Sequence, residues 1–387
     1  MGITLQYNTN DNTVKVSEAE SVTALHKGFF GYMQKGVITL TPEEALYLID
    51  IRNARSYDEN GNELKFNDLA EKFKIDKLIA RYCTFKDWRD RGLIIRPIEE
   101  IKGSYGRSPV KQYPSGKFQI PKYAIQGLLF PEDLVTIIDD ETAGKEIYEN
   151  YWLGQFGTYK AEQRGKLSKL DVYETLLMIK HCNLTLRNAT EEQMIKAAKE
   201  KRDDFLLMYD VYEDWRLRGY ILKTGFKFGT HFRLYMPKAS PTKKGDEWVH
   251  SKHVIQVFPR KSKLLISEWA RAIRVAHSVK KTFILAIPGV KSKGKKVELD
   301  FLLYHRKKEG IENPKDDKPS LLMLSLSEEE YIGGAELADS IEEAKRIGLD
   351  LLLAIADRET SVTYYRVKRI ELPGSKYEYY EIEWEQP

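Results

Sequence analysis

Residues 82–93, YCTFKDWRDRGL, and residues 209–220, YDVYEDWRLRGY, are two versions of one short sequence. Trp88 and Trp215 occupy the same position in the two versions, 127 residues apart. A repeat at a long, fixed spacing indicates a duplicated structural unit, and it constrains the architecture before any single helix or strand is assigned. We therefore expect two copies of one N-terminal half-domain.

The sequence upstream extends both copies, which we place at residues 1–96 and 124–222. GFFG at 28–31 matches GQFG at 154–157, and an amphipathic run typical of a helix follows each match. In this alignment the second copy is about four residues longer between the glycines and the helix, within 158–165. The two copies are thus expected to differ mainly in one hairpin.

A second, fainter repeat lies downstream. Residues 273–287, IRVAHSVKKTFILAI, align without gaps to residues 341–355, IEEAKRIGLDLLLAI, at an offset of 68. Both segments are typical of an amphipathic helix that leads into a buried strand. We expect two copies of a C-terminal half-domain, residues 223–310 and 311–387. The segment 97–123, rich in glycine and proline, is expected to be a linker.

The four parts follow one another as N-half, N-half, C-half and C-half. The middle two form one complete unit, whereas each outer half alone would expose an apolar face. The outer halves are therefore expected to pack on each other as a second unit. The predicted fold class is α/β mixed (α+β), with antiparallel or mixed sheets and helices in two kinds of subdomain.

The composition narrows the class of protein. Hydrophobic residues make up 42% and charged residues 31% of the chain, and no apolar run approaches the roughly 20 residues of a membrane helix. The only two cysteines, Cys83 and Cys182, exclude a disulfide framework or a zinc cluster and suit a reducing cytoplasm. We expect a cytoplasmic protein with no membrane partner. The net charge of +4 is only a weak indication of an anionic partner.

The segment 220–281 carries the residues that suggest chemistry. It contains GFKFG at 225–229, FRLY at 232–235, HS at 250–251 and RVAHSVKK at 274–281. This succession closely resembles the catalytic region of archaeal tRNA-splicing endonucleases. The resemblance extends over nearly the whole chain and implies the three-unit, single-chain type, in which a complete unit lies between two half-units.

The resemblance also implies an active site and an activity. In that family the tyrosine of the FRxY strand, the histidine of the HS pair and the second lysine after HSV are catalytic; here they are Tyr235, His250 and Lys281. The implied enzyme is a lyase-type endoribonuclease that excises introns from precursor tRNA at bulge-helix-bulge junctions. No cofactor and no metal are expected, and the dense acidic motifs of a two-metal nuclease are missing from this region.

These three residue types suit cleavage by the RNA's own 2′-hydroxyl. A base must take the hydroxyl proton, an acid must protonate the 5′-oxygen, and a cation must stabilise the charge on the phosphorane. His250, with a reference pKa of about 6.5, suits the acid, and Lys281 suits the cation. Tyr235 would be the base, and its reference pKa of about 10 should be lowered by Lys281. The expected products are a 2′,3′-cyclic phosphate and a 5′-hydroxyl.

Each of these residues taken alone has a simpler interpretation. A tyrosine that ends a strand usually packs, a lone histidine often contacts solvent, and a lysine can flank a buried strand. His231, His253 and His277 also compete for the role of the catalytic histidine. The combination of motifs, and their order along the chain, favours the catalytic interpretation.

The last quarter of the chain is an internal control. At the offset of 68, Lys281 aligns with Leu349 and His250 aligns with Lys318, and no equivalent of the FRxY strand is found in residues 311–387. Only one of the two units is therefore expected to cut RNA.

Several basic residues are candidates for RNA binding. Arg274 matches the family arginine that stacks on a bulged base. A guanidinium plane can stack on any base without reading its edge. The alternative is that Arg274 forms a surface ion pair. The loop that should supply a second arginine offers Lys293 and Lys295 instead, so lysines substitute or the clamp is incomplete. The longer hairpin adds Lys160 and Arg164, although surface loops also drift freely.

The resemblance predicts an assembly as well. In relatives, an acidic loop on the non-catalytic unit inserts into a cleft on a catalytic unit. The matching loop here contains Asp357 and Glu359. With two units per chain, a homodimer would hold two active sites, which suits a substrate with two cut points. A non-catalytic scaffold that binds structured RNA and a general nuclease for structured RNA are the two rival functions.

Overall fold

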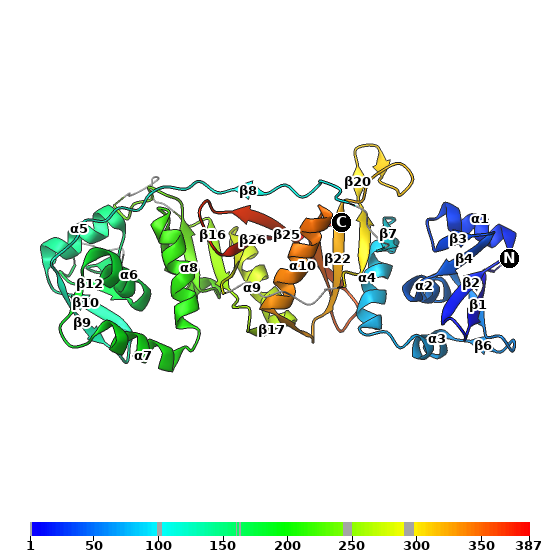
Figure 1. The fold of residues 1–387 in the computed structure, drawn as a ribbon, viewed down its shortest axis with the longest axis horizontal. Helices are drawn as coiled ribbons and strands as arrows, with labels where there is room; N and C mark the ends of the chain where they lie inside the picture. Colours follow the sequence, from blue (N-terminus) through cyan, green and yellow to red (C-terminus); the bar gives the residue numbers. More distant parts are fainter. Residues whose placement is uncertain (1, 99–102, 160, 162–163, 243–249, 290–297) are drawn as a thin grey trace.

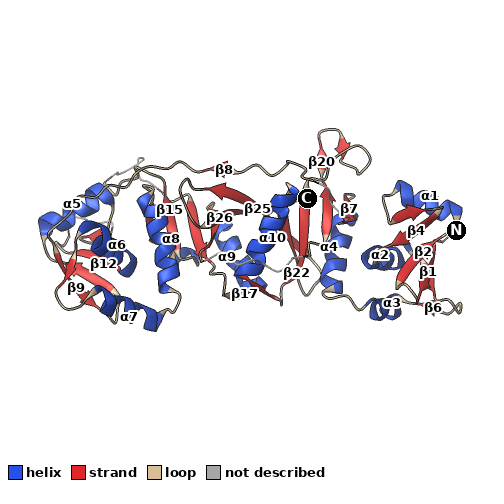
Figure 2. Cartoon of the chain, in the orientation of Figure 1, coloured by secondary structure: helices blue, strands red, loops and turns tan. Residues whose placement is uncertain are grey.

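A computed structural model describes residues 2–98, 103–159, 161, 164–242, 250–289 and 298–387. The molecule is elongated, with the N-terminal half-domain at one end, its second copy at the other end, and the C-terminal halves between them (Figure 1). All parts contain both helices and strands, in agreement with the predicted α/β mixed class (Figure 2). Within the described residues, every helix is too short or too polar to cross a bilayer.

The first N-terminal half folds around a six-stranded sheet in the order β3-β4-β2-β1-β5-β6. Its elements are β1 (Thr4–Asn8), β2 (Thr13–Val16), α1 (Ala19–Lys27), β3 (Tyr32–Gln34), β4 (Val37–Leu40), α2 (Pro42–Arg52), β5 (Arg55–Tyr57), β6 (Glu63–Leu64), α3 (Phe66–Phe73), α4 (Leu78–Asp90) and β7 (Ile94–Pro97).

The second N-terminal half repeats this path with the sheet order β11-β12-β10-β9-β13. Its elements are β9 (Gln126–Phe130), β10 (Val135–Ile138), α5 (Glu141–Tyr151), β11 (Gln155–Phe156), β12 (Ser168–Asp171), α6 (Val172–Cys182), β13 (Thr185–Leu186), α7 (Glu191–Lys201), α8 (Phe205–Leu217) and β14 (Ile221–Thr224). Trp88 on α4 and Trp215 on α8 are completely buried, which explains why their surroundings resemble each other so closely.

One detail of the predicted repeat is wrong. The backbone amide of Gly31 donates to the Glu44 carboxylate at 2.9 Å, and the amide of Gly154 donates in the same way to Glu174. The amide of Gly157 donates instead to the carbonyl of Leu167 at 3.0 Å, so Gly31 pairs with Gly154 and not with Gly157. The hairpin of the second copy is therefore seven residues longer, not four, because GFFG and GQFG offer two glycines each and sequence identity selected the wrong one.

The C-terminal halves share one large sheet that runs through the centre of the molecule (Figure 1). From β14 its main path continues through β15 (Phe232–Tyr235), β16 (His253–Val257), β18 (Thr282–Ile287), β26 (Glu378–Glu385), β25 (Val362–Glu371), β24 (Asp350–Ala356), β22 (Leu321–Ser327) and β19 (Phe301–Tyr304) to β7.

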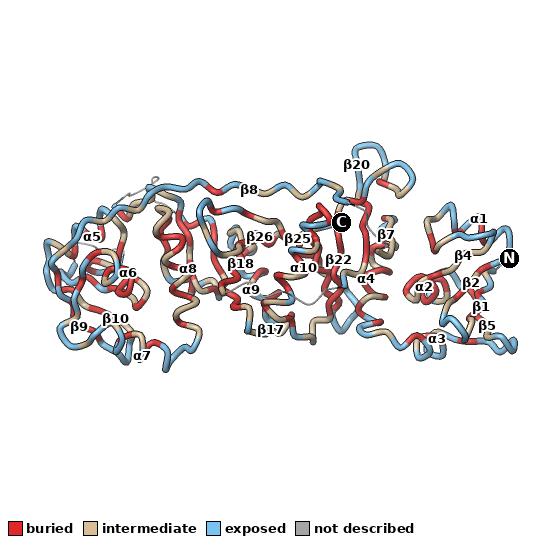
Figure 3. The backbone as a smooth tube through the Cα atoms, viewed as in Figure 1, coloured by how far each residue is buried: buried red, intermediate tan, exposed pale blue. Residues whose placement is uncertain are grey.

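Smaller elements complete the centre: β8 (Lys111–Gln112), η1 (Phe226–Phe228), β17 (Lys263–Leu265), α9 (Ile266–Ser278), β20 (Arg306–Lys307), β21 (Gly310–Ile311), β23 (Tyr331–Gly333) and α10 (Gly334–Ile347). Strands β17 and β23 pair with each other, and β8 of the linker pairs with β25. Buried residues of α9, α10 and the central strands form a common core, whereas most of the linker is exposed (Figure 3).

Strand pairing corrects the predicted boundary at residue 310. Residues 301–304 hydrogen bond β22 and β7, so they lie on the side of the last quarter and not with residues 223–289. Their sequence, FLLY, occupies the place that FRLY at 232–235 holds on the other side, between β14 and β16. An equivalent of the FRxY strand therefore exists, but it precedes the range in which the sequence repeat was sought.

The outer halves pack on each other. Buried residues of α4 and β7 share a core with β19, β22 and β24. The ring centroids of Trp88 and Tyr364 are 5.5 Å apart, and the Tyr364 hydroxyl donates to Asp87 at 2.6 Å. The Thr84 and Ser325 hydroxyls lie 2.8 Å apart. Each N-terminal half thus meets the central sheet through its last helix and last strand.

Candidate active site

Three neighbouring strands of the central sheet bring their ends together at one side of the sheet, which we call the strand edge. Strand β15 runs antiparallel to β16, whereas β16 and β18 are parallel, so β15 ends where β16 and β18 begin. Tyr235 is the last residue of β15, His250 precedes β16, and Lys281 directly precedes β18. The amide of Thr282 donates to the carbonyl of Lys252 at 2.9 Å, which holds the two parallel strands in register at this edge.

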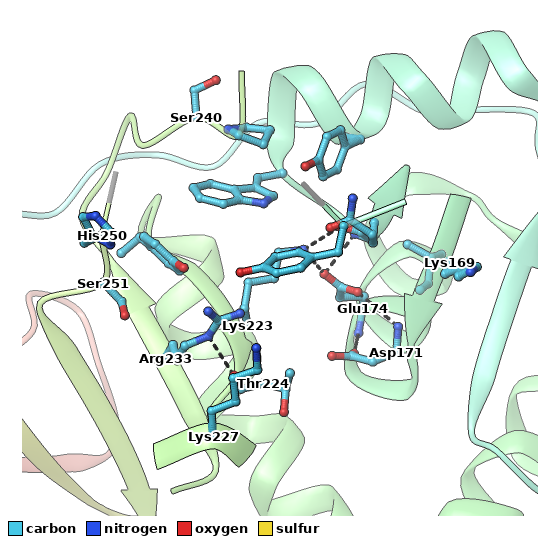
Figure 4. A pocket seen from close by; sticks show the side chains of 18 of the residues that line it. Lys169, Asp171, Glu174, Lys223, Thr224, Lys227, Arg233, Ser240, His250 and Ser251 are labelled. Carbon is cyan, nitrogen blue, oxygen red and sulfur yellow. Dashed lines mark hydrogen bonds and ion pairs between the residues drawn. The ribbon is translucent and has the colours of Figure 1, made fainter. Parts of the chain in front are cut away.

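All three predicted catalytic residues line one cavity of about 590 Å³ between the second N-terminal half and the central sheet. This volume lies within the usual range for ligand sites. In Figure 4, His250 and Ser251 lie on one side of the cavity, and Lys169 and Glu174 from the N-terminal half lie on the other. The lining also includes Trp152, Tyr159, Lys223, Lys227, Phe228 and Arg233.

Tyr235 is almost fully buried, with 6% of its surface exposed. Its ring lies 4.7 Å from the ring of Trp152, which follows α5, and the guanidinium of Arg233 lies 5.9 Å from the Tyr235 centroid. Burial raises the pKa of Tyr235, and the charge of Arg233 counteracts this effect in part. The expectation that Lys281 lowers the Tyr235 pKa is wrong for the free protein, since burial dominates and the opposing charge belongs to Arg233.

Lys281 is half-buried and held by Ser251. Its ammonium donates to the backbone carbonyl of Ser251 and, at 2.9 Å, to the Ser251 hydroxyl. The ammonium also lies 4.7 Å from the centroid of Phe228. Burial lowers the pKa of Lys281, and the charge of Arg233 lowers it further. The lysine is thus fixed at the strand edge and still lines the cavity.

His250 is exposed at the cavity, and the competing histidines lie elsewhere. The His231 Nδ1 atom accepts from the amide of Val257 at 2.9 Å, and burial lowers its pKa to about 4. His253 is buried, which lowers its pKa to about 4 as well. His277 contacts the carbonyl of Ile382 at 3.1 Å. None of these three lines the cavity.

A buried ion pair that was not predicted from the sequence also lines the cavity. The Lys223 ammonium donates to the Glu174 carboxylate at 2.6 Å and to the carbonyl of Gly154 at 2.8 Å. This pair connects β14 of the central sheet to α6 of the N-terminal half. The signal was available, because Lys223 and Arg96 share the offset of 127 and are both cationic.

Of the predicted RNA-binding residues that the structure describes, neither Arg274 nor Arg164 lines the cavity. Arg274 is exposed on α9 and lies close enough to influence the pKa of Tyr365, which its charge lowers against the larger effect of burial. Arg164 is exposed in the long hairpin, where its carbonyl accepts from Thr158 at 2.9 Å. Lys160, Lys293 and Lys295 lie outside the described residues.

The predicted interface residues lie in the turn after β24. Asp357 accepts hydrogen bonds from the amides of Glu359 and Ser361, each at 2.9 Å. Both acidic residues are exposed, and Arg358 between them pairs with Glu329. The turn is therefore tightly formed and presents acidic side chains to solvent.

The opposite end of the central sheet contains the corresponding positions without the trio. Tyr304 ends β19 as Tyr235 ends β15, but Lys318, Pro319 and Leu349 stand where His250, Ser251 and Lys281 stand in the other copy. Instead of a lysine, Arg107 of the linker donates to the carbonyl of Lys318 at 2.8 Å and to that of Pro319 at 3.3 Å.

Known families match both kinds of half-domain. Residues 205–298 match the catalytic C-terminal domain of tRNA intron endonucleases, and residues 8–70 match their N-terminal domain. The first match covers the strands that carry Tyr235, His250 and Lys281.

Individual relatives are similar over long stretches. The chain is 27% identical to a tRNA-splicing endonuclease of Methanococcoides burtonii over 326 residues, which cover 68% of this chain and 90% of the relative. It is 34% identical to one of Thermococcus gammatolerans over 140 residues, 34% of this chain and 78% of the relative. For one of Methanopyrus kandleri the identity is 32% over 145 residues, 36% and 75% of the two chains. The chain therefore belongs to the tRNA-splicing endonuclease family and is an endonuclease.

Proposed function

We propose that this endonuclease excises introns from precursor tRNA by cutting bulge-helix-bulge junctions with Tyr235, His250 and Lys281. One observation supports this most directly. The three side chains come from three separate strand ends and line a single cavity in one unit. At the matching edge of the other unit, a lysine and a leucine replace the histidine and the catalytic lysine.

The proposed reaction uses the substrate's own nucleophile. Tyr235 takes the proton of the 2′-hydroxyl as its oxygen attacks phosphorus, and His250 protonates the departing 5′-oxygen. The Lys281 ammonium stabilises the charge on the phosphorane. The products are a 2′,3′-cyclic phosphate and a 5′-hydroxyl, and no step of this sequence requires a metal ion. Because burial raises the Tyr235 pKa, this base must be assisted by donors and cations around it.

RNA binding is proposed for Arg274 and for four further basic residues. Arg274 is exposed on α9, and the ion pairs among the described residues do not include it, which suits stacking on an unpaired base. Arg164, Lys160, Lys293 and Lys295 would contact phosphates, so the affinity should fall as the salt concentration rises.

We propose a homodimer with one catalytic unit per chain. The exposed acidic turn with Asp357 and Glu359 is a suitable contact for a cleft on the catalytic unit of a second chain. Two separated sites would then match the two cut points of an intron. A solution mass near one chain of 45.0 kDa would contradict this assembly.

The decisive experiment is cleavage of a bulge-helix-bulge RNA by the full chain in excess EDTA, followed by analysis of the RNA ends. Cyclic phosphate and 5′-hydroxyl ends support the proposed reaction. Binding without cleavage, in EDTA and with added magnesium, would indicate a scaffold that only binds structured RNA. Equal cleavage of hairpins without the bulges would indicate a general nuclease.

A further inference from the structure

Ser251 lies between two of the three proposed catalytic residues. Its hydroxyl accepts a hydrogen bond from the Lys281 ammonium at 2.9 Å, and Ser251 lines the same cavity as Tyr235. The side chain is buried, with 6% of the residue exposed, and it lies at the edge where β15, β16 and β18 meet.

The chemistry of a hydroxyl gives this bridge a direction. An ammonium can only donate, so the Ser251 oxygen accepts from Lys281 and its proton remains available for the phenolic oxygen of Tyr235. The ammonium polarises the hydroxyl and strengthens the bond that the hydroxyl donates. A donor aimed at a phenolic oxygen favours the deprotonated form.

We propose that Ser251 is a positioning residue, which passes the influence of Lys281 to Tyr235 and stabilises the phenolic oxygen as the base that accepts the substrate's 2′-hydroxyl proton. This rests on the proposed function of Tyr235. Ser251 itself gives up no proton: its O–H bond is retained, and only the hydrogen bond to Tyr235 strengthens as negative charge develops there.

A purely structural role is the competing explanation, and the second unit argues against it. Pro319 occupies the corresponding position at the start of β22, and the strand edge forms without a hydroxyl. In that unit the tyrosine is retained as Tyr304, whereas the serine and the lysine have both been replaced. The hydroxyl is thus present together with the ammonium, in the unit proposed to be catalytic. Consistent with this role, the Ser251 hydroxyl lowers the Tyr235 pKa against the larger effect of burial.

The test compares Ser251→Ala with Ser251→Thr in the full chain, using single-turnover cleavage of a bulge-helix-bulge RNA from about pH 5 to pH 10. Ser251→Ala should slow cleavage at neutral pH roughly tenfold to a hundredfold, which is less than the roughly 10²–10³-fold cost of losing a donor that contacts the developing charge directly, because Ser251 acts through Tyr235. The limb of the pH profile that reports Tyr235 should move upward by about one unit. Ser251→Thr keeps a hydroxyl and should restore most of the rate and the original profile.

Two further measurements separate the possible outcomes. RNA affinity and the midpoint of thermal unfolding should be nearly unchanged in Ser251→Ala. In the Tyr235→Phe background, Ser251→Ala should add little further loss, since its partner is already missing. A wild-type pH profile for Ser251→Ala, or an equal loss for the alanine and threonine variants with reduced stability, would overturn the role of Ser251. Full activity of Tyr235→Phe would instead overturn the proposed function.

Discussion

The two ends of the central sheet have the same strand arrangement and different chemistry. Each end has a strand that finishes in tyrosine, Tyr235 in β15 or Tyr304 in β19, beside a parallel strand pair. At one end Lys281 binds the carbonyl of Ser251; at the other, Arg107 of the linker binds the carbonyls of Lys318 and Pro319. A cation at the strand edge therefore suits the fold in both units, and only the cavity with a histidine beside the lysine is suited to catalysis.

The N-terminal halves show the same separation of fold and function. Glu44 and Glu174 each accept from a glycine amide and from the amide of the N-cap residue of their own helix, Thr41 or Asp171. Arg96 and Lys223 each donate to a backbone carbonyl in the same region, at 2.7 and 2.8 Å. These shared contacts join each N-terminal half to the central sheet, whereas the hairpin, seven residues longer in one copy, is free to differ.

The largest expected difference between the two units concerns their tyrosines. Tyr235→Phe should slow cleavage by roughly 10²–10⁴-fold, the usual contribution of an acid or base, because the phenolic oxygen is lost and the ring is kept. Tyr304→Phe makes the same chemical change at the other end of the sheet and should leave the rate within about twofold. Single-turnover rates measure both variants. Equal losses would show that the second tyrosine also supports the reaction, directly or through the assembly.

The next expected effect is on stability, at the buried ion pair that lines the cavity. Lys223→Met leaves the Glu174 carboxylate, 4% exposed, without its cation. Removing one partner of a buried pair typically costs about 3–5 kcal/mol of unfolding free energy. Lys223→Arg copies Arg96 of the other unit and should remain close to wild type. Chemical denaturation measures the free energy of unfolding of wild type and both variants. A methionine variant as stable as wild type would mean that Glu174 takes up a proton instead.

Much of this comparison could be predicted from the sequence, because the segments around buried residues have stayed similar in the two copies. Trp88 and Trp215 are completely buried, and the resemblance of the segments around them revealed the duplicated half-domains. The trio of Tyr235, His250 and Lys281 was recognised through motifs whose order matches a family. Their convergence at one cavity then follows from the antiparallel and parallel pairing of three strands.

The parts that were missed depend on contacts between distant segments. The strand that ends at Tyr304 reaches its sheet position by pairing with β22 and β7, which no offset in the sequence expresses. The match between Gly31 and Gly154 becomes visible only through the glutamate carboxylates that accept from these two amides. The bridge made by Ser251 likewise requires β16 and β18 to lie side by side.

Two cations at matching strand edges should have opposite effects when they are removed. Arg107→Ala loses hydrogen bonds to the carbonyls of Lys318 and Pro319 and to Glu312, which should lower stability by about 1–2 kcal/mol without slowing cleavage. Lys281→Ala should nearly abolish cleavage and change stability less. Measuring the cleavage rate and the free energy of unfolding of both variants tests whether one loses stability and the other loses activity. A cleavage defect in Arg107→Ala, at unchanged stability, would show that the linker contributes to the active unit.

The smallest expected effect concerns the N-caps of the matching helices, Thr41 in one copy and Asp171 in the other. Burial, with the charge of Glu174, raises the pKa of Asp171 to about 7 from its ordinary 3.8. A carboxyl that holds its proton more tightly in the folded chain favours folding below its ordinary pKa, and this contribution is lost as the pH rises through about 7. The wild-type half-domain should therefore become less stable as the pH rises from 3.8 to about 7.

Asp171→Thr copies the cap of the other unit and retains an oxygen for the amide of Glu174, which Asp171 binds at 2.8 Å. At about pH 8 the variant should be more stable than wild type by about 1 kcal/mol, since relief of the buried charge exceeds the attraction lost at the helix N-terminus. The difference should shrink towards about pH 4, where Asp171 is protonated and as neutral as threonine. Thermal unfolding across this range measures it. A variant that is less stable than wild type at every pH would mean that the charged cap stabilises α6. The aspartate cap would then make the unit proposed to be catalytic more stable than a threonine cap would.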